Sequence, residues 1–337
     1  MLHRFAKLVA ASTVLLILAG SLVTSHEAGL SVPDWPTSYG WNMFTFPPSM
    51  WVANIFYEHG HRLIASSVGF LTIILAIWLW LADPRRWLKW FGVAALGAVI
   101  AQGVLGGITV LFFLPAAVST AHAGLAEIFF GMTVAIALFT SPGWMAGYGT
   151  ADQASYGAAP DTGAADIDEL TLRRLATATT ALIFLQILIG AAMRHTGAGL
   201  AIPDFPWMFG HVVPDHWNGR IAVHFTHRVG ALFVTAGIGT LSAYVWSHHR
   251  GRRELTRPAT LIVALVATQV TLGALTVLTR RDVWINSFHV VCGALVLTTS
   301  LVLTLRSWRA QFARESQERQ SAGSTQRKEH IISGASA

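Results

Sequence analysis

Four histidines stand at corresponding positions of two similar apolar segments, two of them in each half of the chain. They are His61, His122, His227 and His289, and each lies near the end of a run long enough to cross a membrane as a helix. Neutral imidazole is a common axial ligand of haem iron, and a planar cofactor fits between facing side chains of a helix bundle. Two histidines in each half therefore predict one haem site per half, with these four residues as metal ligands.

An internal duplication relates these positions. The segment that begins at Gln102, Gln-Gly-Val-Leu-Gly-Gly-Ile-Thr-Val-Leu, is similar to the segment that begins at Gln269, Gln-Val-Thr-Leu-Gly-Ala-Leu-Thr-Val-Leu. Their offset, 269 − 102 = 167, also relates the second histidine of each half, and an offset of 227 − 61 = 166 relates the first. A single histidine at a helix end is usually an interfacial residue or a cap. Ionisable residues inside membrane segments are costly and usually functional, so the repetition of all four favours ligation.

The two halves differ three residues before the first histidine of each. Glu58 precedes His61, whereas His224 precedes His227. This spacing puts both side chains on one face if the helix extends that far, and a carboxylate there can act as a base or stabilise positive charge on a substrate. We therefore predict that Glu58 is catalytic, with chemistry in the first half and electron handling in the second. The alternative is an acidic residue that stabilises a helix N-terminus.

Arg62 and Arg228 directly follow the first histidine of each half. A guanidinium can bind a carboxylate through two hydrogen bonds, and haem carries two propionates. Both arginines are therefore candidate cofactor-binding residues. The alternative is an ordinary interfacial anchor for the helix.

The composition is that of a membrane protein. Of the 337 residues, 53% are hydrophobic and 12% are charged, whereas soluble domains average about 25% charged residues. The first apolar run follows Arg4 and Lys7 and resembles a cleaved signal peptide, but its partner in the second half favours a retained helix. We expect eight membrane helices, at residues 8–24, 63–82, 90–112, 119–140, 175–193, 229–247, 259–279 and 286–305.

The basic residues predict the orientation. The net charge is +6, but its distribution indicates a membrane topology and not a nucleic-acid partner. Arginines and lysines gather at the N-terminus, at 85–89, at 173–174, at 250–257 and in the tail after residue 306, all on one side of eight alternating helices. Both termini are therefore predicted to be cytoplasmic, in the cell inner membrane. The exceptions lie on the outer side of the second half and are Arg194, Arg220, Arg280 and Arg281.

The predicted fold is an all-α membrane protein with eight transmembrane helices in two tandem, pseudo-symmetric four-helix bundles. Residues 1–140 form the N-terminal bundle for the substrate, and residues 175–306 form the C-terminal bundle. Residues 141–174, rich in Ala, Gly, Asp and Pro, form a cytoplasmic linker. Residues 307–337 form a disordered cytoplasmic tail. An even number of helices in each half makes the repeats parallel, related by an axis along the membrane normal.

The outer loops are duplicated as well. Ala-Gly-Leu-Ser-Val-Pro-Asp-Trp-Pro at 28–36 matches Ala-Gly-Leu-Ala-Ile-Pro-Asp-Phe-Pro at 198–206. Each proline fixes φ and biases its predecessor towards extended geometry. The repeated string is either a structural loop retained after duplication or a lid over a pocket that opens outward.

These motifs together resemble the haem A synthase family (CtaA/Cox15). The resemblance rests on Glu58-x-x-His61-Arg62, on Ala121-His122-Ala123-Gly124, on the Pro-Asp-aromatic-Pro loops and on the duplication, and it covers residues 8–306. It implies oxidation of a methyl substituent of haem O to the formyl group of haem A, for use in terminal oxidases.

The resemblance also implies roles for the site residues. Glu58 would be the catalytic carboxylate, His61 and His122 would flank the substrate haem O, and His227 and His289 would ligate a haem b that passes electrons. The implied partners are haem O, delivered by haem O synthase, the assembling terminal oxidase and membrane lipid, with a homo-oligomer left open. One departure is visible: some members carry a cysteine pair in an outer loop, whereas Cys292 is the single cysteine of this chain.

Two other functions fit parts of the pattern. A di-haem electron-transfer protein similar to cytochrome b561 would explain four histidines but not a carboxylate in one half alone. A transporter built from repeats is the weaker alternative, because the helix centres lack a polar path.

Overall fold

The computed structural model describes residues 1–145 and 163–334, with side chains for 1–145 and 167–309. Within these ranges the chain is helical, with two isolated bridges and no strand. Eight helices are long and apolar enough to cross a membrane, so the chain is a multi-pass membrane protein. They are α1 Leu2–Ser25, α2 Asn54–Ala82, α3 Arg86–Leu111, α4 Ala116–Phe139, α7 Gly163–His195, α8 Gly219–His248, α9 Arg253–Leu278 and α10 Val283–Gly334.

Prolines and polar caps set several helix ends. Asp83 and Pro84 follow α2, and Pro115 precedes α4 as its N-cap, because proline ends a helix or begins one but is costly inside it. The side chain of Asn218 caps α8 by accepting a hydrogen bond from the Ile221 amide at 2.9 Å. The short helix α5 Pro142–Met145 follows α4, and two 3₁₀ turns, Met43–Thr45 and Pro48–Met50, lie in the first long loop.

All eight expected spans are present, and every helix begins earlier than its predicted span. For two of them the earlier start includes predicted site residues. The spans expected at 63–82 and 229–247 start at Asn54 and Gly219. The added turns are rich in histidine and other polar residues, so hydropathy alone could not extend the helix through them. This extension places the predicted site residues inside the helices and not at their ends.

The predicted linker and the predicted tail both differ from the structure where it describes them. Half of the expected linker, at 146–162, lies outside the described residues. Its last part, from Gly163 on, is not a linker but the beginning of α7. Residues 307–334 continue α10 as a helix, although their low hydrophobicity predicts a disordered tail. Low hydrophobicity argues against burial, whereas the Gln, Glu, Arg and Ala of this segment are all good helix formers.

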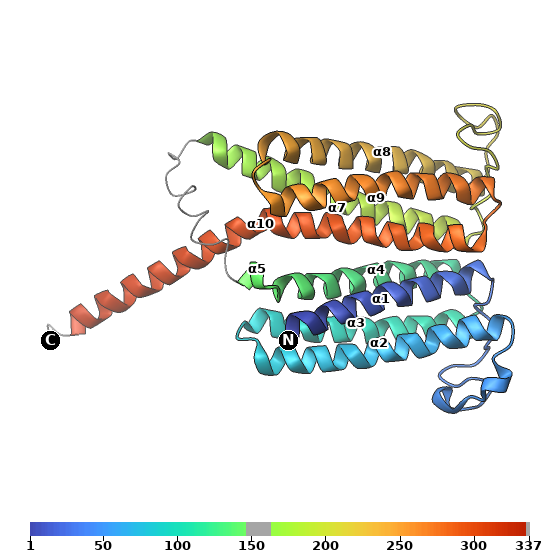
Figure 1. Cartoon of the computed structure of the whole chain (residues 1–337), viewed down its shortest axis with the longest axis horizontal. Coiled ribbons are helices and arrows are strands. Elements are labelled where there is room, and N and C mark those ends of the chain that lie inside the picture. Colours follow the sequence, from blue (N-terminus) through green and yellow to red (C-terminus); the bar gives the residue numbers. More distant parts are fainter. Residues whose placement is uncertain (146–162, 335–337) are drawn as a thin grey trace.

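The helices fall into two groups of four (Figure 1). In the first group α1 packs against α2 and α4, and α3 packs against the same two helices. In the second group α7 and α9 each pack against α8 and α10. In each group the two helices that carry the predicted ligands, α2 with α4 and α8 with α10, therefore stand diagonally. We infer from this pattern that the two halves repeat one four-helix arrangement.

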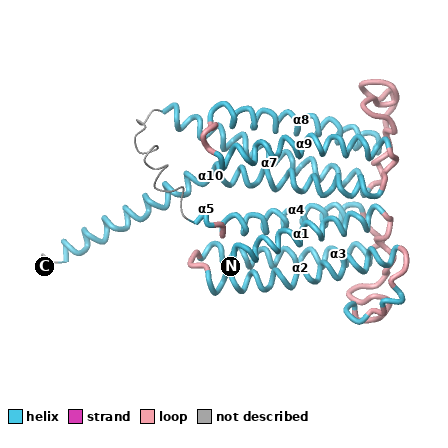
Figure 2. Tube along the Cα trace, in the orientation of Figure 1, coloured by secondary structure: helices cyan, strands magenta, loops and turns pink. Residues whose placement is uncertain are grey.

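Both long loops lie at the same end of the helices, which we call the loop end (Figure 2). The N-terminus and the C-terminal extension of α10 lie at the opposite end (Figure 1). The first half has a buried cluster around Leu75, Leu79, Leu88 and Ile136. In the second half, buried clusters form around Leu241 with Leu255 and around Ile238 with Ile262.

The halves meet where α4 contacts α7 and α10 and where α1 contacts α10. Two glycines of α4 allow this approach. A Cβ at Gly124 would lie 2.7 Å from Cδ2 of Leu188, and one at Gly131 would lie 3.2 Å from Cδ2 of Leu301. Small residues let helix backbones approach closely in lipid, where no hydrophobic force brings helices together.

Gly124→Leu should lower the thermal unfolding temperature in detergent, because the added side chain must displace Leu188 of α7. Overpacking of this kind costs about 1–3 kcal/mol. The matched control is Gly97→Leu in α3, where no atom lies within 4 Å of an added Cβ. Equal melting temperatures for the two variants would show that the approach of α4 to α7 does not depend on this glycine.

Candidate functional site

Each histidine of the first half packs against a glycine of the preceding helix. A Cβ at Gly20 of α1 would lie 3.0 Å from Cε1 of His61 on α2. A Cβ at Gly106 of α3 would lie 3.2 Å from Cε1 of His122 on α4. Because glycine has no side chain, each imidazole lies directly on helix backbone.

The second half repeats this contact. A Cβ at Gly190 of α7 would lie 2.8 Å from Cε1 of His227 on α8, and one at Gly273 of α9 would lie 3.0 Å from Cε1 of His289 on α10. All four predicted ligands therefore sit on glycines. The sequence contains 30 glycines. The signal that could have found these four is their repetition, at offsets of 190 − 20 = 170 and 273 − 106 = 167 residues.

The two imidazoles of each half lie close enough to interact electrostatically, His61 with His122 and His227 with His289. Nδ1 of His61, His122 and His289 is buried without a hydrogen-bond partner, and buried polar atoms are rarely left in that state. Among the described residues no three His, Cys, Asp or Glu side chains gather as they would for a bare metal ion. Paired imidazoles with unused ring nitrogens fit an iron whose remaining ligands come from a porphyrin.

Three of the four glycines have a glutamine one turn earlier in the same helix. Gln102 donates to the carbonyl oxygen of His122 at 2.9 Å, and Gln186 donates to that of His227 at 2.7 Å. Gln186 Nε2 also lies 3.0 Å from Nδ1 of His227, and Gln269 Nε2 lies 3.5 Å from Nε2 of His289. In α1 the corresponding residue is Leu16. His61 is thus the one predicted ligand without a glutamine beside it.

Glu58 is buried near the start of α2, at 3% relative exposure. Since α2 begins at Asn54, the condition for sharing a helical face with His61 is met. One carboxylate oxygen accepts from Arg62 at 2.7 Å, and the other accepts from the Val32 amide at 2.8 Å. The carboxylate is therefore an ion-paired group tied to the first long loop.

His224 occupies the same place in the second half. Its Nδ1 accepts from the Ile202 amide at 3.2 Å, and its Nε2 lies 3.2 Å from Nε of Arg228. Both residues therefore anchor a loop, but only Glu58 brings a negative charge. This comparison separates a shared structural role from the feature that is unique to the first half.

Arg62 and Arg228 hold the two long loops. Arg62 donates to the carbonyl oxygens of Val32, Asp34 and Thr37 at 2.7–2.9 Å. Arg228 does the same to the carbonyl oxygens of its own loop, which are those of Ile202, Asp204 and Trp207. These hydrogen bonds favour an anchoring role, and binding of haem propionates by either arginine stays a prediction.

The first loop covers the loop end of the first half. A Cβ at Gly107 of α3 would lie 2.5 Å from Cδ2 of Trp35, so the indole rests on the helix beside the glycine that contacts His122. Below the loop, His59 is buried against the rings of Phe46 and Trp51. These contacts favour the lid interpretation of the Pro-Asp-Trp-Pro string.

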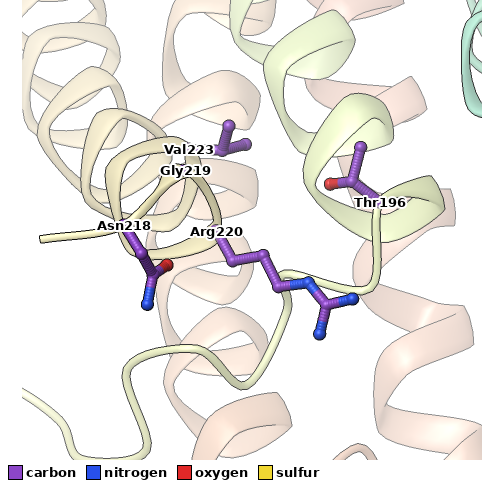
Figure 3. Close-up of a pocket in the computed structure, with 5 residues that line it drawn as sticks. All are labelled: Thr196, Asn218, Gly219, Arg220 and Val223. Atoms are coloured by element: carbon purple, nitrogen blue, oxygen red, sulfur yellow. The ribbon is translucent and has the colours of Figure 1, made fainter.

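A cavity of about 470 Å³ opens at the loop end of the second half. It is lined by Thr196, Asn218, Gly219, Arg220 and Val223. Figure 3 shows Arg220 extending from the first turn of α8 towards the segment around Thr196. Val223 lies one helical turn before His227 on α8, and His227 itself does not line the cavity.

Comparisons with known proteins find relatives over most of the chain. A family model described as cytochrome oxidase assembly protein, COX15-CtaA, matches residues 3–301. The chain is similar to Heme A synthase of Halalkalibacterium halodurans, with 30% identity over 303 residues, which cover 88% of this chain and 93% of that protein. It is also similar to Heme A synthase of Symbiobacterium thermophilum, with 28% identity over 272 residues and 79% and 83% coverage.

The first loop should loosen in acid because of Asp34. Burial raises the pKa of this carboxyl, but hydrogen bonds from Gly40, Thr37 and Tyr39 outweigh burial and hold the pKa below its ordinary value of 3.8. Its contribution to loop stability is therefore complete above the ordinary pKa and is lost as the pH falls through the lowered folded-state pKa. Amide-exchange protection factors of Tyr39 and Gly40 should fall in that window. In Asp34→Asn they should be low and independent of pH, and a wild-type loop without pH dependence would contradict this account.

Proposed function

The chain belongs to the COX15-CtaA family of cytochrome oxidase assembly proteins, and we propose that it is a haem A synthase. In this reaction a methyl substituent of haem O is oxidised to the formyl group of haem A, which terminal oxidases use. The observation that carries the proposal is the pair of imidazoles in each half, set on glycines of neighbouring helices, in a chain matched by this family over nearly its whole length.

We assign haem O to the first half and a resident haem b to the second. His61 and His122 would flank the substrate, and His227 and His289 would hold haem b, which supplies one-electron redox chemistry beside the substrate pocket when it is bound. The glutamines support this division. His227 and His289 both have a glutamine at the ring, as a permanent ligand pair requires for orientation. His61 has none and suits a porphyrin that must leave.

Glu58 is the proposed catalytic carboxylate. As a carboxylate paired with Arg62, it can accept a proton or stabilise positive charge on the substrate. The same ion pair and the Val32 amide fix the carboxylate in position. Because His224 takes over the loop contact in the second half, loop anchoring alone does not require a carboxylate at this position.

We further propose that the loop end faces outward and that both termini are cytoplasmic. The termini lie at the end opposite the two loops (Figure 1). Exposed basic residues of the α2–α3 and α8–α9 connections lie at the end of the termini, as the positive-inside rule requires of a cytoplasmic face. Haem O would reach the protein from haem O synthase, and haem A would pass to the assembling oxidase.

A di-haem electron-transfer protein similar to cytochrome b561 is disfavoured by the family match. Pigment extraction separates the two functions directly. Cells that express the chain together with a haem O source yield formyl-haem only if the chain is the enzyme.

Glu58→Gln should leave haem binding intact and reduce the haem A yield at least about tenfold, the lower end of what one acid–base group contributes. Glu58→His copies the second half and keeps a loop acceptor while removing the carboxylate, so it should be equally inactive. Glu27→Gln, at an exposed position, is the matched control. Extracted pigments and the reduced-minus-oxidised spectrum are measured in each variant, and a wild-type haem A yield in Glu58→Gln would remove Glu58 from the mechanism.

Replacement of the four histidines by alanine should divide them into two classes. His227→Ala and His289→Ala should lose the optical spectrum of the resident haem, because each removes an axial ligand. His61→Ala and His122→Ala should keep that spectrum and lose haem O conversion. Resident haem that persists in both second-half variants would place it elsewhere.

A further inference from the structure

Four arginines at the loop end run against the positive-inside pattern, and all of them belong to the second half. They are Arg194, Arg220, Arg280 and Arg281. By the offsets of the duplication, the corresponding residues of the first half are Thr24, Asn54, Phe113 and Leu114. The loop end of the second half is therefore cationic at each position where the first half is neutral.

Arg194 is the most unusual of the four, because it is a largely buried cation with only neutral partners. Its Nη2 donates to the carbonyl oxygen of Ser21 and to Oγ of Ser25 on α1, both at 2.9 Å. Its Nε is buried without a hydrogen-bond partner. A buried charge without a counter-ion is strongly unfavourable, so the geometry calls for an anion that the polypeptide does not provide.

Nearby charges point to the same requirement. Arg281 lies within electrostatic range of Arg194 and adds a second positive charge. Asp282 forms no ion pair with Arg194 or Arg281. Its Oδ1 caps α10 instead, accepting from the amides of Trp284 and Ile285 at 3.0 and 3.1 Å. Two arginines thus converge without an acidic partner in the described part of the chain.

The location identifies the anion. Arg194 lies within electrostatic range of His289, the predicted axial ligand on α10. The group proposed to sit there, haem b, carries two carboxylates, and guanidinium binds carboxylate through charge-assisted hydrogen bonds. This step rests on the proposed function, since it takes haem as the occupant of the second half.

We infer that Arg194 and Arg281 bind the propionates of the haem held in the second half, and that their replacement by Thr24 and Leu114 leaves the first half without such a clamp. The asymmetry matches the different fates of the two porphyrins. A resident haem must be retained through many turnovers, whereas the substrate must enter and its product must leave. Ligand histidines alone do not distinguish the halves in this respect, but the arginines do.

The test compares haem b with its dimethyl ester, in which both carboxylates are blocked. Purified wild-type protein stripped of haem should release bound haem b about tenfold more slowly than the ester, the effect of one charge-assisted hydrogen bond, when release is followed by transfer to apomyoglobin. Arg194→Gln and Arg281→Gln should release haem b faster and discriminate less between haem b and the ester. Arg86→Gln, which removes an exposed charge at the opposite end, should behave as wild type.

Equal release of haem b and the ester from the wild-type protein would overturn the inference, and this arm does not depend on how any arginine variant folds. Variants that melt at a lower temperature but still discriminate as the wild type does would also overturn it, because Arg194 would then only fasten α7 to α1. Failure of the proposed function itself looks different. In that case cells that express the chain with a haem O source would yield no formyl-haem, whatever the release rates of haem b and its ester.

Discussion

The contact between an imidazole and bare helix backbone is the constraint on which the rest of the structure depends. A Cβ added at Gly20, Gly106, Gly190 or Gly273 would lie between 2.8 and 3.2 Å from Cε1 of the histidine that packs there. There is therefore little room for any side chain at these four positions. Each ring therefore rests with Cε1 against helix backbone, and the two rings of each half lie within electrostatic range of each other. A porphyrin needs both faces of its iron covered at a fixed separation, and four such contacts provide two pairs of rings on diagonal helices.

The eight membrane helices could be predicted from hydropathy, and the pairing of the four histidines could be predicted from their repeated offset. Ligation by these histidines and catalysis by Glu58 stay predictions. The starts of α2 and α8 could not be predicted, since hydropathy fails where polar residues extend a membrane helix. The partners of Arg62 could not be predicted either. They are carbonyl oxygens 25–30 residues away in an irregular loop, and no spacing rule relates a helix residue to such atoms.

The duplication explains the scaffold, and its departures identify where the halves have diverged. The residue that contacts the long loop is Glu58 in the first half and His224 in the second, so its charge differs. The residue one turn before the glycine that contacts the first histidine is Leu16 in the first half and Gln186 in the second. In each case the two residues keep equivalent places in their helices, and only the chemistry of the side chain differs. In a duplicated protein, residues that are alike in both halves mainly build the shared fold. Residues that differ between equivalent positions are therefore the better candidates for function.

The polar contacts between α1, α7 and α10 have a consequence for the assembly of the whole chain. Ser25 Oγ lies 3.0 Å from Ser287 Oγ and accepts from Asn286 at 3.1 Å, in addition to its bond from Arg194. Hydrogen bonds of this kind hold helices together in lipid, where apolar surfaces gain nothing by meeting. Direct hydrogen bonds at the loop end therefore fasten α1 to α7 and α10, so the two halves are held together by contacts far from the segment that joins them in the chain.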